Sequence, residues 1–555
     1  MSNHIARHGL SRDRDELLQS INDEDILNLA SSYHNGDPCE FFRSSARGSS
    51  NVCFFVSFNS GDRWVVRVPM QPCLSFDAKV KIDREVATMK ILAERTTIPI
   101  PKVVAHSLSG RRRFGPPEYI ILEYVEGTAL TSESCGRMNH RLKLYLYQQL
   151  ADMYAQLRRI TFPAIGALGF GEGGSIEVVQ GPVSCEYNMH ALEGVTPSGA
   201  REFFGPEGIH TSATEYASSL LKMVRNRFEQ SPASVTSETD SITKLYYLEQ
   251  FESTVSSWVN PARDAKPFVL THGNFKQKNI IVDEAMNIKA ITNWQWSRVV
   301  PLQFFNPPRW LVTDRIKSMC WPATFDIHVT QLNLLRAALQ EREQELYRRT
   351  RLYNEWSKID RGGGLLVAAA LEEIDLDAII AIGADYQDHG KRPIARIEKF
   401  TSSNPGQRVI VAKKLQDKEN YDEACKKQQL GEFVPRPPYK PKKRISEMQK
   451  ETVDYWIRSP QFYERQREKE RERRKALELE KAKEMEVEKE NGNNAATDNP
   501  SAGWLKRTAA QMQESRENGE GSGLELSPMQ DPQDTAEGRA SRLPRLDFMM
   551  DSVSS

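Results

Sequence analysis

Apolar and polar residues follow two different periods along the first 300 residues, and these periods predict both strands and helices. Asn51–Pro69 contains two runs rich in Val, Phe and Trp around the polar turn Asn59–Asp62, which predicts a β-hairpin. Tyr119–Val125 is an apolar, β-branched run and predicts a buried strand. Between them, Asp83–Glu94 carries apolar residues at helical spacing and Pro99 follows as a stop signal. This part of the chain therefore predicts a small unit of sheet and helix.

Helical spacing dominates the chain after about residue 140. Helices are expected at Leu142–Leu157, at 325–358 and near 370–382, and a second hairpin is expected at Asn279–Thr292. Before the first hairpin, Asp15–Tyr33 has the apolar spacing of one short, half-buried helix. The expected fold class is α+β, with a small sheet-containing unit followed by a larger helical unit.

Charge divides the 555-residue chain into a part that can build a core and a part that is more polar. The 75 basic and 75 acidic residues balance, but charged residues become more frequent after about residue 390. Of the 27 residues in 464–490, 20 are charged, and opposite charges recur three or four residues apart, which favours a solvated single helix. An apolar heptad seam is missing there, which argues against a stable coiled coil. The expected organisation is a helical leader (1–40), the small unit (41–126), the helical unit (127–390), a basic, proline-containing linker (391–460), a charged single helix (461–490) and a disordered tail (491–555).

The same patterns bear on location and partners. No apolar run is long enough to span a bilayer, and Arg and Asp near the N-terminus occupy the place of a signal peptide's apolar segment. The seven cysteines form no CxxC pair, so we expect a reduced, cytoplasmic protein without a zinc site or disulfide framework. The cluster Lys440–Arg444 is similar to a short nuclear-localisation signal, but aromatic residues do not alternate with basic ones as in single-strand nucleic-acid platforms. We expect no membrane and no nucleic-acid partner.

The candidate chemistry lies in Leu270–Asp283, which contains His272-Gly-Asn274 and, five residues after Asn274, Asn279; Ile291–Trp296 follows it. With the upstream hairpin, these motifs resemble the aminoglycoside phosphotransferase family, in the branch common among filamentous fungi, over about residues 45–315. The resemblance implies a bilobal protein-kinase-like fold, with a small antiparallel-sheet lobe and a large helical lobe. It also implies ATP and Mg²⁺ as cofactors.

The resemblance assigns roles to four residues of the large lobe. Asn279 matches the family's metal-binding Asn, and His272 shapes the loop. Asn274 and Asn293 stand where the family has its catalytic Asp and its metal-binding Asp. An amide cannot accept a proton near neutral pH, and Mg²⁺ is normally held through one or two carboxylates, so both changes predict an impaired enzyme.

In the small lobe, the resemblance places Arg67 at the position of the phosphate-pairing strand Lys and makes Glu85 its helix partner. Gly48 is the single glycine of the expected phosphate loop, and Glu123 and Val125 belong to the hinge-like segment between the lobes. These are the expected nucleotide-binding residues.

Three functions remain open from the sequence. The first is a catalytically impaired homologue that binds a ligand or a protein partner of unknown identity. The second is an active ATP-dependent kinase of a small-molecule hydroxyl, and the third is a scaffold that acts through its charged C-terminal helix. Asp283 and Glu284 are poor replacements for the missing acids, because they lie at the expected tip of the second hairpin.

Overall fold

The computed structural model describes residues 3–109, 115–195, 208–260, 264–265, 267–357, 364–387 and 393–428. The predicted helix at 461–490, the tail at 491–555 and the cluster Lys440–Arg444 lie outside these ranges. Within them, no helix is both long and apolar enough to cross a membrane.

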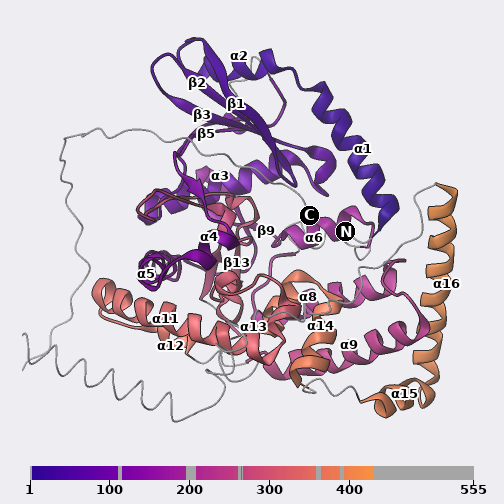
Figure 1. The fold of residues 1–555 in the computed structure, drawn as a ribbon. Coiled ribbons are helices and arrows are strands. Elements are labelled where there is room, and N and C mark those ends of the chain that lie inside the picture. The colour runs from indigo at the N-terminus through magenta and orange to yellow at the C-terminus, as the bar shows by residue number, and fades with distance from the viewer. Residues whose placement is uncertain are drawn as a thin grey trace, which may run out of the picture. The chain divides into compact units, whose positions relative to one another are not determined.

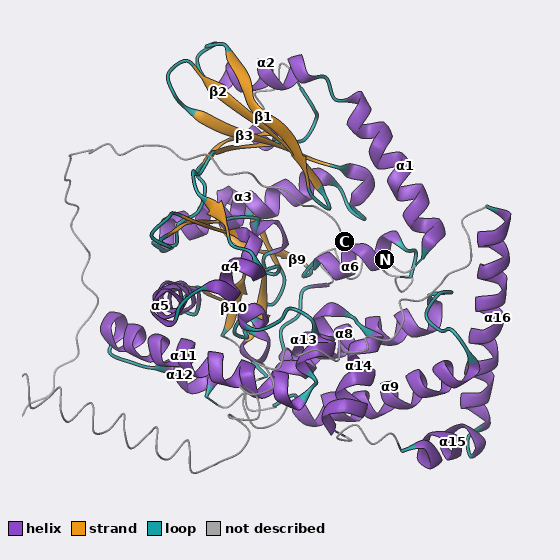
Figure 2. Ribbon diagram, viewed as in Figure 1, coloured by secondary structure: helices purple, strands orange, loops and turns teal. Residues whose placement is uncertain are grey.

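The small lobe is built on an antiparallel sheet of five strands in the order β1-β2-β3-β5-β4 (Figure 2). The predicted hairpin forms β2 and β3, and the predicted helix forms part of α3. Side chains alternate across the sheet, so Val52, Phe54 and Val56 of β2 pack with α2, whereas the opposite face looks toward α3. The elements are β1 (Cys39–Arg47), β2 (Asn51–Phe58), β3 (Arg63–Pro69), η1 (Gln71–Cys73), α3 (Ala78–Arg95), β4 (Val103–His106), η2 (Ser107–Ser109) and β5 (Ile120–Glu123).

The leader differs from the single helix that the sequence predicts. The structure has α1 (His4–Ser20) and α2 (Asp23–Tyr33), separated at Ile21, whose backbone is extended. Asn22 causes the second start, because its side chain accepts a hydrogen bond from the backbone N–H of Glu24 and caps α2. The first strand, β1, also begins at Cys39, within the range expected for the leader.

The large lobe is mainly helical and contains three small antiparallel sheets, β13-β10-β7, β12-β11-β6 and β8-β9 (Figure 1). The predicted second hairpin forms β11 and β12, and Asp283 holds its turn by accepting a hydrogen bond from the backbone N–H of Asn287. The first part comprises β6 (Thr128–Ala129), α4 (Ser132–Arg137), α5 (His140–Leu157), β7 (Thr161–Phe162), β8 (Ala167–Phe170), η3 (Glu172–Gly174), β9 (Ile176–Gln180), α6 (Cys185–Leu192), α8 (Ala213–Gln230), α9 (Glu238–Trp258) and β10 (Phe268–Thr271). The second part comprises η6 (Gln277–Asn279), β11 (Ile280–Val282), β12 (Ile288–Ile291), η7 (Trp294–Trp296), β13 (Arg298–Pro301), η8 (Leu302–Phe304), η9 (Arg309–Leu311), α10 (Ile316–Met319), α11 (Pro322–Tyr347), α12 (Arg351–Trp356), α13 (Gly364–Glu373), α14 (Leu376–Ala381) and the π-helix η11 (Ile382–Gln387).

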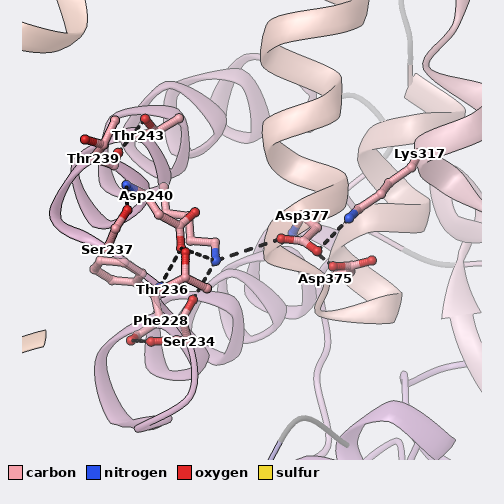
Figure 3. A network of polar contacts seen from close by, with 11 residues as sticks. Phe228, Ser234, Thr236, Ser237, Thr239, Asp240, Thr243, Lys317, Asp375 and Asp377 are labelled. Atoms are coloured by element: carbon pink, nitrogen blue, oxygen red, sulfur yellow. Dashed lines mark hydrogen bonds and ion pairs between the residues drawn. The ribbon is translucent and has the colours of Figure 1, made fainter. Parts of the chain in front are cut away.

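A polar network ties the C-terminal helices of this lobe together. Figure 3 shows Asp377 of α14 next to Lys317 of α10, and the two side chains form an ion pair of 2.6 Å. Lys244 of α9 lies 4.0 Å from Asp377 and 2.9 Å from Asp240. Charged side chains therefore join three helices at the edge of the apolar core.

The beginning of the segment expected to be a linker is helical. It forms α15 (Ile394–Ser402) and α16 (Pro405–Lys427), and α16 packs on the large lobe. Lys414 is buried, and its ammonium donates to the carbonyl of Ser231 (2.8 Å). The sequence analysis assigned this segment to a linker because it is highly charged, but a few of its residues, such as Val411 and Cys425, are buried in the core.

Candidate functional site

The small-lobe part of the site is an ion pair between Arg67 and Glu85. Arg67 lies on the β3 face opposite α2, as strand alternation requires, and Glu85 reaches it from α3. Arg67 Nη2 is 2.5 Å from Glu85 Oε1, and the side chains are only 8% and 1% exposed. The structure therefore brings together the two residues that the sequence paired.

The other small-lobe candidates occupy two separate places. Gly48 lies in the turn between β1 and β2, where its N–H donates to the carbonyl of Asn51 (2.8 Å). Glu123 ends β5, and its exposed carboxylate pairs with Lys102 (3.2 Å). Val125 follows it in the half-buried segment that leads into the large lobe. Gly48 is thus hydrogen-bonded to Asn51, whereas Glu123 lies three β3–β5 register positions from the level of Arg67.

Sequence reasoning missed a buried chain of polar side chains beside this ion pair. Lys81, one helical turn before Glu85, donates from Nζ to Asn51 Oδ1 (2.6 Å). Asn51 Nδ2 in turn donates to Gln295 Oε1 of the large lobe (2.6 Å). Burial lowers the pKa of Lys81 to about 7, with the positive charge of Arg67 acting in the same direction and Glu85 opposing it. The spacing of Lys81 and Glu85 was a local signal for this neighbour, but Asn51 and Gln295 carried none.

The large-lobe part is the loop after β10, and His272 holds it. Its Nδ1 accepts the backbone N–H of Asn274 (3.3 Å), and its Nε2 donates to the carbonyl of Thr292 (2.9 Å). Burial lowers the pKa of His272 to about 4, so the ring is neutral at pH 7. His272 is therefore a brace between the loop and the end of β12 rather than a base.

Gly273 is a second support of the loop that sequence reasoning left out. Its φ is +76°, and a Cβ atom at this position would lie 1.8 Å from the backbone oxygen of Trp296. Glycine alone fits both the backbone conformation and the close approach of these two segments.

The three asparagines converge on this loop. Asn279 is buried and donates from Nδ2 to the carbonyl of Asn274 (2.8 Å). Asn293 donates from Nδ2 to Asn279 Oδ1 (3.4 Å), and its backbone is left-handed with φ 72°, a conformation that Asn tolerates better than most residues. Trp294 and Trp296, which follow, are buried core residues. The two amides that the sequence analysis expects at metal positions are thus hydrogen-bonded to each other.

The side chains of these three asparagines are poor ligands for Mg²⁺. All three side chains are neutral, and the oxygen of Asn279 is engaged with Asn293. Throughout the described ranges, no group of three or more His, Cys, Asp or Glu residues is placed to hold a metal ion. Since Mg²⁺ normally binds through carboxylates, a resident divalent cation does not fit this arrangement.

A groove of about 400 Å³ lies elsewhere in the large lobe. It is formed by α5, α11, β12 and the segment at Ile98–Pro99, with Asp152 and Arg342 on its wall. None of the candidate site residues lines it. The groove is therefore separate from the candidate site at the loop.

Three comparisons show which known proteins the chain is similar to. The model of the phosphotransferase enzyme family matches residues 43–299. Over 136 residues the chain is 27% identical to "Altered inheritance of mitochondria protein 9, mitochondrial" of Debaryomyces hansenii, a match that spans 23% of this chain and only 21% of that protein.

The solved structures to which the chain is distantly similar include two phosphotransferases. One is the GDP complex of wild-type aminoglycoside 2'-phosphotransferase-IIIa, with 13% identity, a TM-score of 0.34, and coverage of 69% of this chain and 92% of that chain. Another is macrolide 2'-phosphotransferase type I, with 11% identity, a TM-score of 0.33, and coverage of 72% and 98%. The sequence match makes residues 43–299 similar to the phosphotransferase enzyme family, and the two lobes described above form a protein-kinase-like fold.

Proposed function

We propose that this protein binds a nucleotide through its kinase-like body but has lost most or all phosphoryl transfer, and that it acts by binding a ligand or a protein partner. The observation that carries the proposal is the pair of amides at positions 274 and 293. Both stand where the family has carboxylates, and Asn293 is hydrogen-bonded to the remaining metal-position residue, Asn279.

The chemical consequence follows from what phosphoryl transfer needs. A carboxylate close to the attacking hydroxyl orients it and accepts its proton, a role typically worth roughly 10²–10⁴-fold in rate. Asn274 can orient a hydroxyl but cannot accept its proton. The metal that neutralises the phosphates has lost its charged ligand as well, so the two losses reinforce each other.

Nucleotide binding itself is supported by the small lobe. The pair formed by Arg67 and Glu85 is intact and buried, and a guanidinium can contact phosphate oxygens through two donors. ATP is therefore the expected ligand by family resemblance, with weak dependence on Mg²⁺.

An active phosphotransferase is the second candidate, because the loop around Asn274 keeps its support. Its backbone is held on one side by His272 and on the other by Asn279, and neither contact uses the side chain of Asn274. A substrate hydroxyl would be the acceptor in this case.

The location of the protein stays a prediction. Cytoplasmic placement came from sequence composition, and nuclear placement came from the basic cluster Lys440–Arg444. The printed name of the Debaryomyces hansenii relative includes the word mitochondrial, which makes mitochondria the third compartment to examine with a fluorescent fusion.

The test compares ATP turnover and ATP binding in the full-length protein and in the double variant Asn274→Asp with Asn293→Asp. These changes preserve side-chain shape and restore two charges. We expect trace turnover at most from the unaltered protein, and ATP binding by the double variant that is about tenfold tighter with Mg²⁺ than with EDTA. Asn279→Ala in the double variant is the control, and it should remove the gain.

A different result would favour the second candidate. Rapid, Mg²⁺-dependent ATP consumption by the unaltered protein, abolished by Asn274→Ala, would establish a working kinase with an unusual site.

A further inference from the structure

The buried chain Lys81–Asn51–Gln295 links the two lobes directly beside the Arg67–Glu85 ion pair. Lys81 and Asn51 belong to the small lobe, Gln295 belongs to η7 of the large lobe, and all three side chains are buried. Both hydrogen bonds of the chain measure 2.6 Å. This chain lies between the turn that contains Gly48 and the segment that contains Asn293.

The charges in this place do not balance. Arg67 and Lys81 are both cationic when protonated, and Glu85 is the carboxylate that faces them. Burying a charge without a counter-charge is unfavourable, and burial accordingly lowers the pKa of Lys81. When Lys81 is protonated, the group is short of one negative charge.

Among the described residues, two further buried hydrogen-bond donors of the small lobe have no acceptor. Ser50 Oγ, next to Asn51 in the chain, and Arg67 Nε are both buried and have no hydrogen-bond partner among the described atoms. Buried donors are almost always satisfied in folded proteins, so unsatisfied ones beside excess positive charge mark a place for an anion.

We propose that Ser50, Arg67 and Lys81 form a subsite for the terminal phosphate of a nucleoside triphosphate, in which the Lys81 ammonium supplies the positive charge that a divalent cation would otherwise bring. A phosphate oxygen replaces the side-chain oxygen of Asn51, Oδ1, as the acceptor of Lys81. The inference rests on the proposed nucleotide binding and adds the residue that makes it independent of metal.

Asn51 has the properties of an internal substitute for the phosphate. Its amide oxygen is neutral, so it satisfies one N–H of Lys81 without balancing the charge. Its backbone carbonyl accepts the N–H of Gly48, which makes it part of the turn that would have to shift when a phosphate enters. The chain to Gln295 then opens as the phosphate binds.

Binding of ATP and of inorganic tripolyphosphate to the full-length protein, measured by calorimetry with Mg²⁺ and with EDTA, tests this subsite. We expect affinities that agree within about threefold between the two conditions. Lys81→Met should weaken binding of both anions at least tenfold in EDTA. Lys79→Met is the matched control, because Lys79 is exposed on the same helix, and it should bind as the unaltered protein does.

Asn51→Asp provides a second variant that does not depend on removing a buried charge. Its carboxylate would pair with Lys81 and mimic the bound anion, so the melting temperature should rise while tripolyphosphate binding in EDTA falls at least tenfold. Should Lys81→Met fail to fold, this variant decides the question by itself.

The outcomes separate this subsite from the proposed function. Nucleotide binding that vanishes in EDTA, or that is unchanged in both Lys81→Met and Asn51→Asp, would overturn the subsite and leave nucleotide binding standing. If neither ATP nor tripolyphosphate binds, both the subsite and the proposed nucleotide binding are overturned. Vigorous ATP turnover would overturn only the loss of catalysis.

Discussion

The small-lobe and large-lobe parts of the site are held by different interactions. In the small lobe, the ion pair between Arg67 and Glu85 holds the site together, since each buried charge is the partner of the other. In the large lobe, backbone hydrogen bonds to His272 and Asn279 hold the loop, together with the close approach at Gly273. Asn274 and Asn293 are neutral, so no side-chain charge at these two positions takes part in that support.

This difference would allow catalytic groups to be lost without a change of shape, as the proposed function requires. Removing one charge from a buried pair costs about 3–5 kcal/mol, because the other charge is left uncompensated. Exchanging a carboxylate for an amide of the same shape at positions 274 and 293 leaves the two hydrogen bonds of His272 and the one from Asn279 to the Asn274 carbonyl in place. The side chains at positions 274 and 293 can therefore change without loss of stability, whereas both residues of the ion pair are needed for stability.

The largest effect should come from breaking the support of the loop. Gly273→Ala places a Cβ atom 1.8 Å from the oxygen of Trp296 at a positive φ, so one of the two backbone segments must move. We expect a loss of more than about 5 kcal/mol of unfolding free energy, or no soluble protein. The measurement is guanidinium unfolding followed by circular dichroism.

Gly48→Ala is the matched control for this change. Gly48 has an ordinary φ, and an added Cβ would make only a normal contact of 3.6 Å with the carbonyl of Asn51. Its unfolding free energy should stay within about 1 kcal/mol of the unaltered protein. Equal effects of the two alanines would refute the view that Gly273 supports the loop.

The second effect in size concerns the small lobe. Glu85→Gln leaves Arg67 and Lys81 buried without a counter-charge, so we expect a loss of about 3–5 kcal/mol. Adding Arg67→Met should recover part of that loss, which a double-mutant cycle from urea unfolding would show as coupling above about 1 kcal/mol. The exposed pair Lys90–Glu94, 4.0 Å apart, serves as the control and should couple by no more than about 0.5 kcal/mol. Independent, additive losses at Arg67 and Glu85 would contradict the constraint.

The sequence predicted the parts of this comparison that depend on local spacing. Helix α3 and the hairpins β2–β3 and β11–β12 follow from periodicity and turn residues, and the family motif located the asparagines. Gly273 lay inside the motif, but its need for a positive φ was not predicted, although glycine in a tight loop often has one.

Other features depend on contacts between distant residues. Asn51 meets Gln295 across 244 positions, and no pattern near either residue indicates that they touch. The helix α16 is highly charged, and its burial against the large lobe depends on carbonyl groups at Ser231 and Glu229 that accept from Lys414. The break between α1 and α2 turned on one cap, Asn22, which outweighed a continuous helical spacing.

The smallest of the three effects is a pH dependence of the unfolding free energy that comes from His272 in the loop. Burial lowers the pKa of His272 to about 4, against about 6.5 for a solvated imidazole. Between these values the unfolded chain takes up a proton that the folded protein does not. The contribution is therefore fully present above pH 6.5 and is lost as the pH falls toward 4, by about 3 kcal/mol in total.

His272→Gln isolates this contribution, because glutamine can donate and accept but does not titrate. Burial also lowers the pKa of His190 to about 3 and that of His328 to about 4, so the unaltered protein should lose more stability in acid than His272 alone explains. The difference in unfolding free energy between the two proteins, measured from pH 7 to pH 4.5, should shrink as the pH falls. A difference that stays constant over this range would mean that His272 becomes protonated in the folded loop, and the loop would then be held by a charge, as the small lobe is.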